Sequence, residues 1–342
     1  MLMHALEKLA RQNNLSAAES YASIKDILSG ASIVKSAAFL ALLRSKGEIP
    51  EEALGIIRAM KEQMVKVPKI DGMLDIVGTG GDGAHTVNIS TGAGILAASL
   101  GVKIAKHGNR ASSSLCGSAD VLEKLGLPLL ENPEQVVQAI QETGFGFMFA
   151  PHFHPALKKI APIRKELKMR TIFNLIGPLV NPAQADYYLI GVYEEKIMDF
   201  IADILLEMPI RKALVVHGSG IDELSCLGSS QIIEVQNGSK RKYSLDPEKL
   251  GLPRCSLKDL QGGNPQKNAS LLIEALNGKH KAIGETLALN AGAGLYAAGK
   301  TATIQEGVSI ALNSLYRGCG LRKLQELIAF SQKKEVSSEL SG

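Results

Sequence analysis

Apolar residues recur at helical spacing through the first 66 residues of the chain. Ile27 and Leu28 follow Ile24 by three and four residues, so all three fall on one face of an α-helix. Gly47 ends a later segment of the same kind, and Pro50 begins the next one with two acids in its first turn. The pattern predicts that this region contains helices only.

The pattern changes beyond residue 67, where short apolar runs alternate with helical segments. This alternation is typical of βα units, whose strands form a mostly parallel sheet. A turn at Asn237-Gly238 predicts a β-hairpin within residues 230–245. The other predicted strands are Leu74–Val77, Val102–Ala105, Tyr187–Val192 and Ala213–Val216. The predicted fold class is α/β, with a small all-helical N-terminal domain and a large domain around a mostly parallel central sheet.

Composition and charge limit the classes of function. The chain has 342 residues, 45% of them apolar, and a formal net charge of +4. This excess suits a small anionic substrate, but it is too small and scattered to indicate a nucleic-acid partner. The basic stretch at residues 164–170 could be a nucleic-acid patch or a solvated helix face. The four cysteines lack metal-site spacing, and no signal peptide or membrane-spanning stretch is visible, so we expect a cytoplasmic protein with reduced thiols.

A glycine-rich loop, Gly78–Gly83, follows the first predicted strand and matches the GxGxxG pattern of dinucleotide-binding proteins. A nicotinamide enzyme also needs an acid at the end of the second strand, whereas Lys106 and His107 stand there. Asp82 within the loop would repel a bare pyrophosphate unless a metal or a ribose lay between them. The residues therefore favour an anion held by backbone N–H groups over a dinucleotide.

The segment Thr86–Gly92 comes directly after this loop and supplies hydroxyl and amide side chains at the predicted start of a helix. These side chains could simply cap the helix. Because they follow the glycine loop so closely, we favour a phosphate and metal site.

A second polar stretch, Lys106–Asp120, is the most informative in the chain. Its first thirteen residues include two cations, one asparagine and four serines, and it runs from a predicted strand into a predicted helix. A cation surrounded by hydroxyl and backbone donors is what a multiply charged phosphate requires. A surface loop could also be polar, but it would rarely have this composition between two such elements.

Three further motifs occur in the rest of the chain. Asp222 and Glu223 follow the strand Ala213–Val216, where adjacent carboxylates suit Mg²⁺ but could also stabilise a helix N-terminus. An arginine in the proline-rich region 151–182 could bind a carboxylate through two hydrogen bonds. Gly294–Thr301 matches the P-loop pattern, but its Leu- and Ala-rich surroundings predict the end of a helix instead.

Together these motifs resemble the anthranilate phosphoribosyltransferase family of tryptophan biosynthesis. The resemblance extends from about residue 5 to residue 330, in the family's order and approximate spacing. The matching residues are Gly78–Asp82, Asn88–Thr91, Lys106–Arg110, Gly117–Asp120, Arg164, Arg170–Pro182 and Asp222-Glu223. Leu115 and Cys116 replace more polar residues of the family, and Lys168 stands where the family often has glycine.

The resemblance implies transfer of the 5-phosphoribosyl group from phosphoribosyl pyrophosphate to the amine of anthranilate, with release of pyrophosphate. It implies a helical domain at residues 1–67, joined through a helical segment near residues 160–182 to an α/β domain at residues 72–335. A homodimer formed through the helical domain is also expected. The resemblance implies two Mg²⁺ ions, and it implies neither a membrane nor a nucleic acid as partner.

The same resemblance assigns roles to individual residues. Ser90, Asp222 and Glu223 would hold the metal, and Gly78, Asn109 and Arg164 would bind anthranilate, the arginine through the carboxylate. Contacts to phosphoribosyl pyrophosphate are expected from Gly78, Gly81, Asp82, Thr86, Asn88, Ile89, Ser90, Thr91, Lys106, His107, Gly108, Asn109, Arg110, Ala111, Ser112, Ser113, Ser114 and Ser118. No general base is evident, so catalysis is expected to come from stabilising the leaving group and an oxocarbenium-like transition state.

Two other functions remain open from the residues. A pyrimidine nucleoside phosphorylase of the same fold would use phosphate and a nucleoside, and would not need Asp222 and Glu223 for magnesium. A nucleic-acid-binding protein of the same fold that had lost catalysis would be expected to lack Arg164 or the acidic pair, all of which this chain retains.

Overall fold

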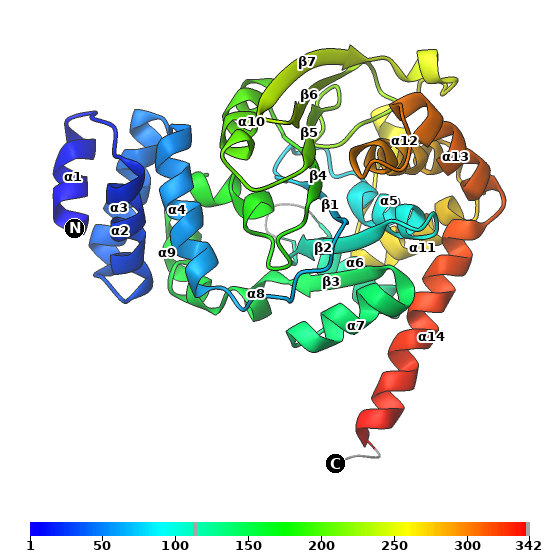
Figure 1. Ribbon diagram of the computed structural model, residues 1–342, viewed down its shortest axis with the longest axis horizontal. Helices are drawn as coiled ribbons and strands as arrows, with labels where there is room; N and C mark the ends of the chain where they lie inside the picture. The colour runs from blue at the N-terminus through cyan, green and yellow to red at the C-terminus, as the bar shows by residue number, and fades with distance from the viewer. Residues whose placement is uncertain (112–114, 340–342) are drawn as a thin grey trace.

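The computed structural model describes residues 1–111 and 115–339, with side chains to residue 332. Four helices form a bundle at one end of the molecule, beside a larger part built around a seven-stranded sheet (Figure 1). The bundle helices are α1 (Leu2–Ala10), α2 (Ala17–Leu28), α3 (Ile33–Lys46) and α4 (Pro50–Gln63). The predicted fold class is confirmed, and so is the prediction that the first region contains helices only.

Local interactions explain where the bundle helices begin and end. The Ser16 hydroxyl accepts a hydrogen bond from Glu19 N at 3.2 Å, and Ser16 N donates to the Glu19 carboxylate at 2.8 Å, which caps α2. Gly47 follows α3 with a φ of +89°, which glycine adopts without steric cost. The fully buried Glu52 of α4 pairs with Lys46 of α3 at 3.0 Å and so joins two helices.

The sheet has the strand order β3-β2-β1-β4-β5-β6-β7. Strands β1 to β5 are parallel, whereas β6 and β7 join as an antiparallel hairpin. The strands are β1 (Met73–Gly78), β2 (Lys103–Gly108), β3 (Phe145–Phe149), β4 (Tyr187–Gly191), β5 (Lys212–His217), β6 (Ser230–Gln236) and β7 (Ser239–Leu245). The strand order reverses at β1, which lies between β2 and β4. Open α/β sheets bind ligands at such a point, beyond the carboxyl ends of the strands.

The predicted strands and hairpin are present, and Asn237 and Gly238 form the hairpin turn with φ of 51° and 69°. The prediction that the second strand ends at Ala105 is wrong, because the parallel ladder with β3 continues to Gly108. Lys106 and His107 are therefore strand residues. The apolar pattern did not predict β3, whose five residues are all buried and so lack alternation.

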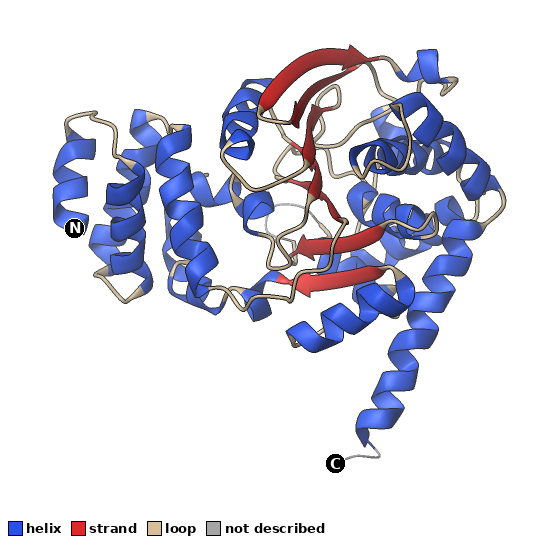
Figure 2. Ribbon diagram, viewed as in Figure 1, coloured by secondary structure: helices blue, strands red, loops and turns tan. Residues whose placement is uncertain are grey.

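Helices lie on both faces of the sheet (Figure 2). They are α5 (Ile89–Ala98), α6 (Ser118–Lys124), α7 (Pro133–Thr143), α8 (Ala150–Phe153), α9 (Ala161–Leu167), α10 (Met198–Leu206), α11 (Pro265–Leu276), α12 (Lys281–Ala297), α13 (Ile304–Tyr316) and α14 (Cys319–Glu339). Short 3₁₀ turns are η1 (Pro155–Lys159), η2 (Ile172–Asn174), η3 (Gly177–Val180), η4 (Glu195–Ile197), η5 (Pro247–Leu250) and η6 (Leu257–Leu260). Ile56 of the bundle and Ile190 of β4 belong to one apolar core, so the bundle and one face of the sheet pack together.

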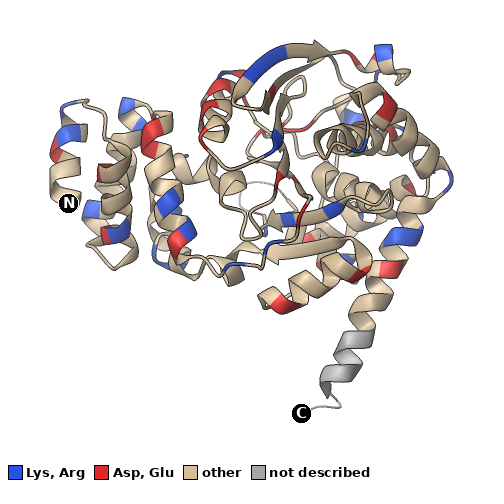
Figure 3. Ribbon diagram, viewed as in Figure 1, with Lys and Arg blue, Asp and Glu red and all other residues tan. Residues whose placement is uncertain are grey.

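Two motifs can now be placed. Gly299 follows α12 with a φ of +68°, so the P-loop match lies at the end of a helix, as predicted. Helix α9 carries the first part of the basic stretch and exposes Lys165 and Glu166, as a solvated helix face does. Lys and Arg are interspersed with Asp and Glu along the ribbon (Figure 3). No helix in the described part of the chain combines the length and apolarity needed to span a membrane.

Candidate active site

Two glycines at the carboxyl ends of neighbouring strands make room for an acidic loop. Gly78 ends β1 and is the register partner of Gly191 at the end of β4. A Cβ on Gly78 would lie 2.1 Å from Asp222 Oδ2, and one on Gly191 would lie 1.4 Å from the Asp222 carbonyl oxygen. Only glycine fits at these two positions, and the loop after β5 therefore lies across the strand ends where the strand order reverses.

Three carboxylates meet in this place. Asp82 of the glycine loop and Asp222 and Glu223 of the loop after β5 each have an oxygen within 4.8 Å of the others. Gly80 N donates to Asp222 Oδ2 at 2.5 Å, which ties the two loops together. Residues 218–229 form no helix, so the alternative that these acids stabilise a helix N-terminus is wrong.

The electrostatics of the cluster favour a bound cation. Burial, followed by repulsion from the Asp82 carboxylate, raises the pKa of Asp222 to about 7. Burial, followed by repulsion from Asp222 and Asp82, raises the pKa of Glu223 well above its usual value. Glu223 Oε2 is buried without a hydrogen-bond partner among the described residues. A cluster of carboxylate oxygens with one buried and unsatisfied fits Mg²⁺, which prefers oxygen ligands.

Lys106 lies beneath the cluster. It is 2% exposed, and its ammonium group donates to the Ile76 carbonyl at 2.7 Å and to Ser90 Oγ at 3.2 Å. Burial lowers the pKa of Lys106, while Asp75, Glu223 and Asp222 act in the opposite direction. The lysine thus connects the predicted metal residue Ser90 to the sheet, from within a strand.

Two buried residues that support Lys106 were not predicted. Asp75 of β1 is fully buried, and Asn181 donates to its carboxylate at 2.7 Å and to the Ala105 carbonyl at 2.8 Å. Burial raises the pKa of Asp75 to about 7, although Lys106 and the Asn181 hydrogen bond oppose the rise. The sequence carried a sign of this, because an acid within an apolar strand needs a partner.

The glycine loop is held from another side by Arg170. Its guanidinium donates to the Gly81 carbonyl and lies 3.9 Å from the centre of the Tyr193 ring. Gly81 itself has a φ of +84°. Arg170 stands six residues after Arg164, so the segment that carries the predicted anthranilate residue contacts the predicted donor loop.

The segment after the glycine loop does not act as a helix cap. Asn88 stands at the N-cap of α5, yet no side chain caps that helix. Thr91 Oγ1 is buried without a hydrogen-bond partner in the described structure, and Ile89 is fully buried. The hydroxyls are therefore not explained by capping, and Ile89 can contribute to binding only through its backbone. Thr86 forms an isolated bridge with Gln261.

The second polar stretch folds back on itself after β2. Ser118 Oγ donates to the Asn109 carbonyl at 3.3 Å and lies over Gly108, where a Cβ would be 2.1 Å away. The backbone N–H of Ala111 donates to Asp120 at 2.9 Å. The Arg110 guanidinium pairs with Asp120 at 2.9 Å and Glu123 at 2.6 Å, so its predicted donor contact would compete with two acids. The predicted contacts of Ser112, Ser113 and Ser114 lie outside the described residues.

His107 is buried and Arg164 is half-buried, and neither has an oppositely charged partner among the described residues. Burial lowers the pKa of His107 to about 3, and its Nε2 has no hydrogen-bond partner among the described residues. Its ring lies 5.1 Å from that of His154, whose Nε2 contacts the Val180 carbonyl at 2.9 Å. Burial lowers the pKa of Arg164, and no carboxylate pairs with it in the described part of the chain. The guanidinium lies 6.0 Å from the Phe173 ring and is suited to bind a substrate anion.

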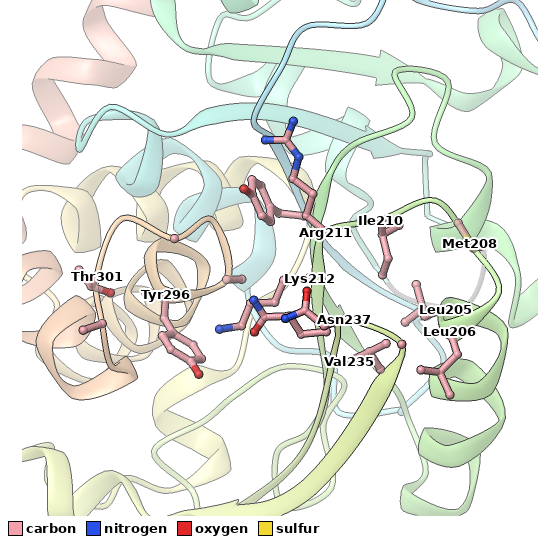
Figure 4. Close-up of a pocket in the computed structure, with 16 residues that line it drawn as sticks. Leu205, Leu206, Met208, Ile210, Arg211, Lys212, Val235, Asn237, Tyr296 and Thr301 are labelled. Atoms are coloured by element: carbon pink, nitrogen blue, oxygen red, sulfur yellow. The ribbon is translucent and has the colours of Figure 1, made fainter.

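A cavity of about 740 Å³ lies away from these residues, at the amino ends of β4 and β5 (Figure 4). Arg211 and Lys212 line it, but both are paired: Arg211 with Asp71, and Lys212 with Glu234 at 3.0 Å. The charges that lack balance are those of Asp82, Asp222 and Glu223 beyond the carboxyl ends of the strands, and we place the active site there.

Comparisons with known proteins agree with this architecture. A family model described as the α/β domain of a glycosyl transferase family matches residues 71–321, and one described as the helical bundle domain matches residues 3–64. Anthranilate phosphoribosyltransferase of Chlamydia caviae is 45% identical over 98% of each chain, and that of Bacillus cereus strain B4264 is 43% identical over 96% of this chain and 97% of its own.

Solved structures extend the comparison. The anthranilate phosphoribosyltransferase of Thermus thermophilus superimposes with a TM-score of 0.90 at 44% identity, covering 96% of this chain and 99% of its own. The Saccharomyces cerevisiae enzyme in complex with phosphoribosyl pyrophosphate and Mg gives a TM-score of 0.88 at 27% identity, covering 97% of this chain and 98% of its own. The chain therefore belongs to the anthranilate phosphoribosyltransferase family.

Proposed function

We propose that this protein transfers the 5-phosphoribosyl group from phosphoribosyl pyrophosphate to the amine of anthranilate, giving N-(5′-phosphoribosyl)anthranilate and pyrophosphate. The observation that carries the proposal is the cluster of Asp82, Asp222 and Glu223 above the buried Lys106. The three acids repel one another, and a magnesium-bound pyrophosphate would supply a cation next to a lysine that can bind phosphate. The reaction belongs to tryptophan biosynthesis.

The metal ligands are part of the proposal. Ser90 and Glu223 would hold one ion, Asp222 and Glu223 a second, and Asp82 lies close enough to both acids to take part. Mg²⁺, when bound, offsets the charge that builds up on the departing pyrophosphate. The proximity of the three carboxylates supports a divalent site, and the use of two ions is inferred from the family resemblance.

The substrate contacts are proposed as they were predicted. The glycine loop, Asn88–Thr91 and Lys106 would bind the donor, while Asn109 and Arg164 would orient anthranilate. The anthranilate amine is a weak nucleophile because its lone pair is conjugated with the ring, so departure of pyrophosphate is the step that needs help. Arg164 is half-buried and has no acidic partner in the part of the chain that the structure describes, which supports its proposed role as the carboxylate ligand.

We also propose a homodimer in the cytoplasm, with domains at residues 1–67 and 72–335. Exposed apolar side chains support a contact through the bundle: Met3 on α1 is 51% exposed, and Ile33 and Val34 on α3 are 60% and 77% exposed. Helices α1 and α3 pack against each other, so these side chains belong to one region. Light scattering should give twice the chain mass, and Val34→Glu should give a monomer.

An assay of anthranilate fluorescence tests the reaction. Purified protein, phosphoribosyl pyrophosphate and Mg²⁺ should consume anthranilate and release an equal amount of pyrophosphate, and EDTA should stop both. Phosphorolysis of uridine without metal would instead identify a nucleoside phosphorylase. Retention of DNA at physiological salt, falling steeply as salt is added, with no consumption of anthranilate, would identify a nucleic-acid-binding protein.

A further inference from the structure

Asn268 connects three segments that are far apart in the sequence. It is the fourth residue of α11 and is 1% exposed. Its Oδ1 accepts a hydrogen bond from Gly263 N at 2.7 Å, and its Nδ2 donates to Asn88 Oδ1 at 2.8 Å. The Nδ2 of Asn88 in turn donates to the Cys116 carbonyl at 3.1 Å. The two amides thus form a relay from the entry of α11 to the second polar stretch.

The relay has a fixed direction. It starts at a backbone N–H, which can only donate, and ends at a backbone carbonyl, which can only accept. Each amide must therefore present its oxygen to the side of Gly263 and its nitrogen to the side of Cys116. Asn88 cannot rotate its amide to suit another partner without losing both contacts. The amide of an asparagine or glutamine supplies this donor and acceptor on one planar group, and burial makes an unsatisfied group costly.

The relay joins the two segments that are proposed to bind the donor. Asn88 precedes the hydroxyls of Ser90 and Thr91, and Cys116 precedes Gly117 and Ser118. The hydrogen bond from Asn88 to the Cys116 carbonyl is a direct contact between these two segments. The relay orients the amide that makes it.

The backbone before α11 is also bound to the exit of the glycine loop. Val87 N donates to the Leu260 carbonyl at 2.9 Å, and Gly262 N donates to the His85 carbonyl at 2.9 Å. A Cβ on Gly262 would lie 2.6 Å from Asn268 Oδ1, so the chain approaches the amide as closely as glycine allows. Residues 260–263 and the side chain of Asn268 therefore form a brace for the donor loops, and Asn268 is its contact with Asn88.

We propose that Asn268 is a positioning residue for the ribose donor, which fixes the distance between the two donor-binding segments through Asn88. The inference rests on the proposed function. Asn268 is not placed in contact with substrate, so its effect should fall on donor binding and leave the chemical step and anthranilate binding largely unchanged.

Two substitutions separate this role from a general loss of structure. Asn268→Asp keeps the acceptor for Gly263 N but removes the donor to Asn88, and Asn268→Leu removes both without adding charge. Asn264→Asp is the matched control: it adds the same charge at the start of the same helix and keeps the oxygen that accepts from Lys267 N at 2.9 Å. Its kinetic constants should equal those of the unsubstituted protein.

The measurement is donor affinity by calorimetry with phosphoribosyl pyrophosphate and Mg²⁺, together with the KM for each substrate and kcat. We expect both Asn268 variants to bind the donor about tenfold more weakly, with kcat and the anthranilate KM changed less than about threefold. Equal donor affinity in folded Asn268→Leu and the unsubstituted protein would overturn the inference, as would a fall in kcat with donor affinity unchanged. Absence of donor binding by the unsubstituted protein would instead overturn the proposed function. If Asn268→Asp and Asn268→Leu do not fold, the smaller Asn268→Ser serves in the same comparison.

Discussion

Buried charge is balanced differently at the two ends of the parallel strands. We call the side of the sheet at their amino ends the amino edge, and the side at their carboxyl ends the carboxyl edge. At the amino edge, burial would raise the pKa of Glu234, but hydrogen bonds from Lys212, Tyr296 and Arg241 outweigh it and lower that pKa. At the carboxyl edge, burial raises the pKa of Asp222 and Glu223, and neighbouring carboxylates raise both further, with Lys106 opposing the rise at Glu223. A buried acid is thus paired with cations at the amino edge, whereas buried acids repel one another at the carboxyl edge.

This difference in charge balance indicates which buried acids contribute to stability and which contribute to function. A buried acid with a cation and hydroxyl partners costs little to keep ionised, whereas a cluster of acids is tolerated only where a ligand supplies the missing charge. The amino edge, although it has a cavity, already satisfies its own charges. The carboxyl edge does not, and substitutions at the two edges should therefore separate activity from stability.

Glu223→Gln should have the largest effect on activity. Removing one carboxylate from the cluster should lower kcat/KM about 1,000-fold, because the charge on the departing pyrophosphate is then poorly offset. The melting temperature should stay the same or rise, since the substitution removes a buried, repelled charge. Glu207→Gln, at an exposed acid near the amino edge, is the control and should change neither quantity. A large loss of stability without loss of activity would contradict the assignment.

Glu234→Gln should show the opposite behaviour. It leaves Lys212, whose side chain is 9% exposed, without its partner at 3.0 Å, so the free energy of unfolding should fall by about 3–5 kcal/mol. Urea denaturation measures this change. The kinetic constants should be unaltered at temperatures where the variant is folded. A change below about 1 kcal/mol would mean that pairing at the amino edge contributes little.

Arg164→Ala should act on one substrate. Loss of a half-buried charged partner should raise the KM for anthranilate by about 30- to 100-fold, equivalent to about 2–3 kcal/mol, with the donor KM nearly constant. Steady-state kinetics with each substrate varied in turn gives both values. Lys165→Ala, on the same helix but exposed, should leave both unchanged. Equal increases in the two KM values would refute the role of Arg164.

Protons and a metal ion compete for the carboxylates at the carboxyl edge, and this competition predicts that metal binding depends on pH. Because the pKa of Asp222 is raised to about 7, a proton occupies this ligand below pH 7 and must leave before a metal binds. The affinity for Mn²⁺, measured by electron paramagnetic resonance without donor, should fall about tenfold per pH unit below pH 7 and level off above pH 8. Constant affinity between these values would show that the acids are not the ligands.

The smallest expected effect lies outside both edges, at Lys168. This residue ends α9 with a φ of +48°, a left-handed conformation that is unfavourable for any residue with a Cβ. Lys168→Gly should therefore stabilise the protein by about 0.5–1 kcal/mol in urea denaturation. Lys165→Gly, within the helix, should instead destabilise it by about 1 kcal/mol. If both substitutions stabilised the protein, or both destabilised it, the left-handed conformation of Lys168 would not explain the result.

Much of this architecture could be predicted from local pattern. Helix spacing and the Asn237-Gly238 turn predicted the bundle and the hairpin, since both depend on neighbouring residues. Strand β3 was missed because it is buried on both faces and its residues therefore do not alternate. Lys106 was expected beyond the second strand because the apolar run ends at Ala105. Its burial could not be predicted, because a buried lysine is rare and its partners are set by packing with β1 and α5.

The candidate site was predictable in its parts but not in its assembly. Asp222 and Glu223 stood out as adjacent acids after a strand, whereas Asp82 was assigned to the donor rather than to the metal. It joins the acids across 140 residues of chain, through a fold that local spacing does not specify. Asn268 carried no motif at all, because its role depends on a hydrogen bond to a residue 180 positions away.

The central claim is that the carboxyl edge holds a metal-bound pyrophosphate, and diffraction with Mn²⁺ in place of Mg²⁺ tests it most directly. Crystals grown with Mn²⁺ and phosphoribosyl pyrophosphate should show an anomalous peak within about 2.5 Å of oxygens from Asp222 or Glu223 and of the pyrophosphate. Bound donor with no anomalous peak at these acids, or a peak elsewhere in the molecule, would contradict the account.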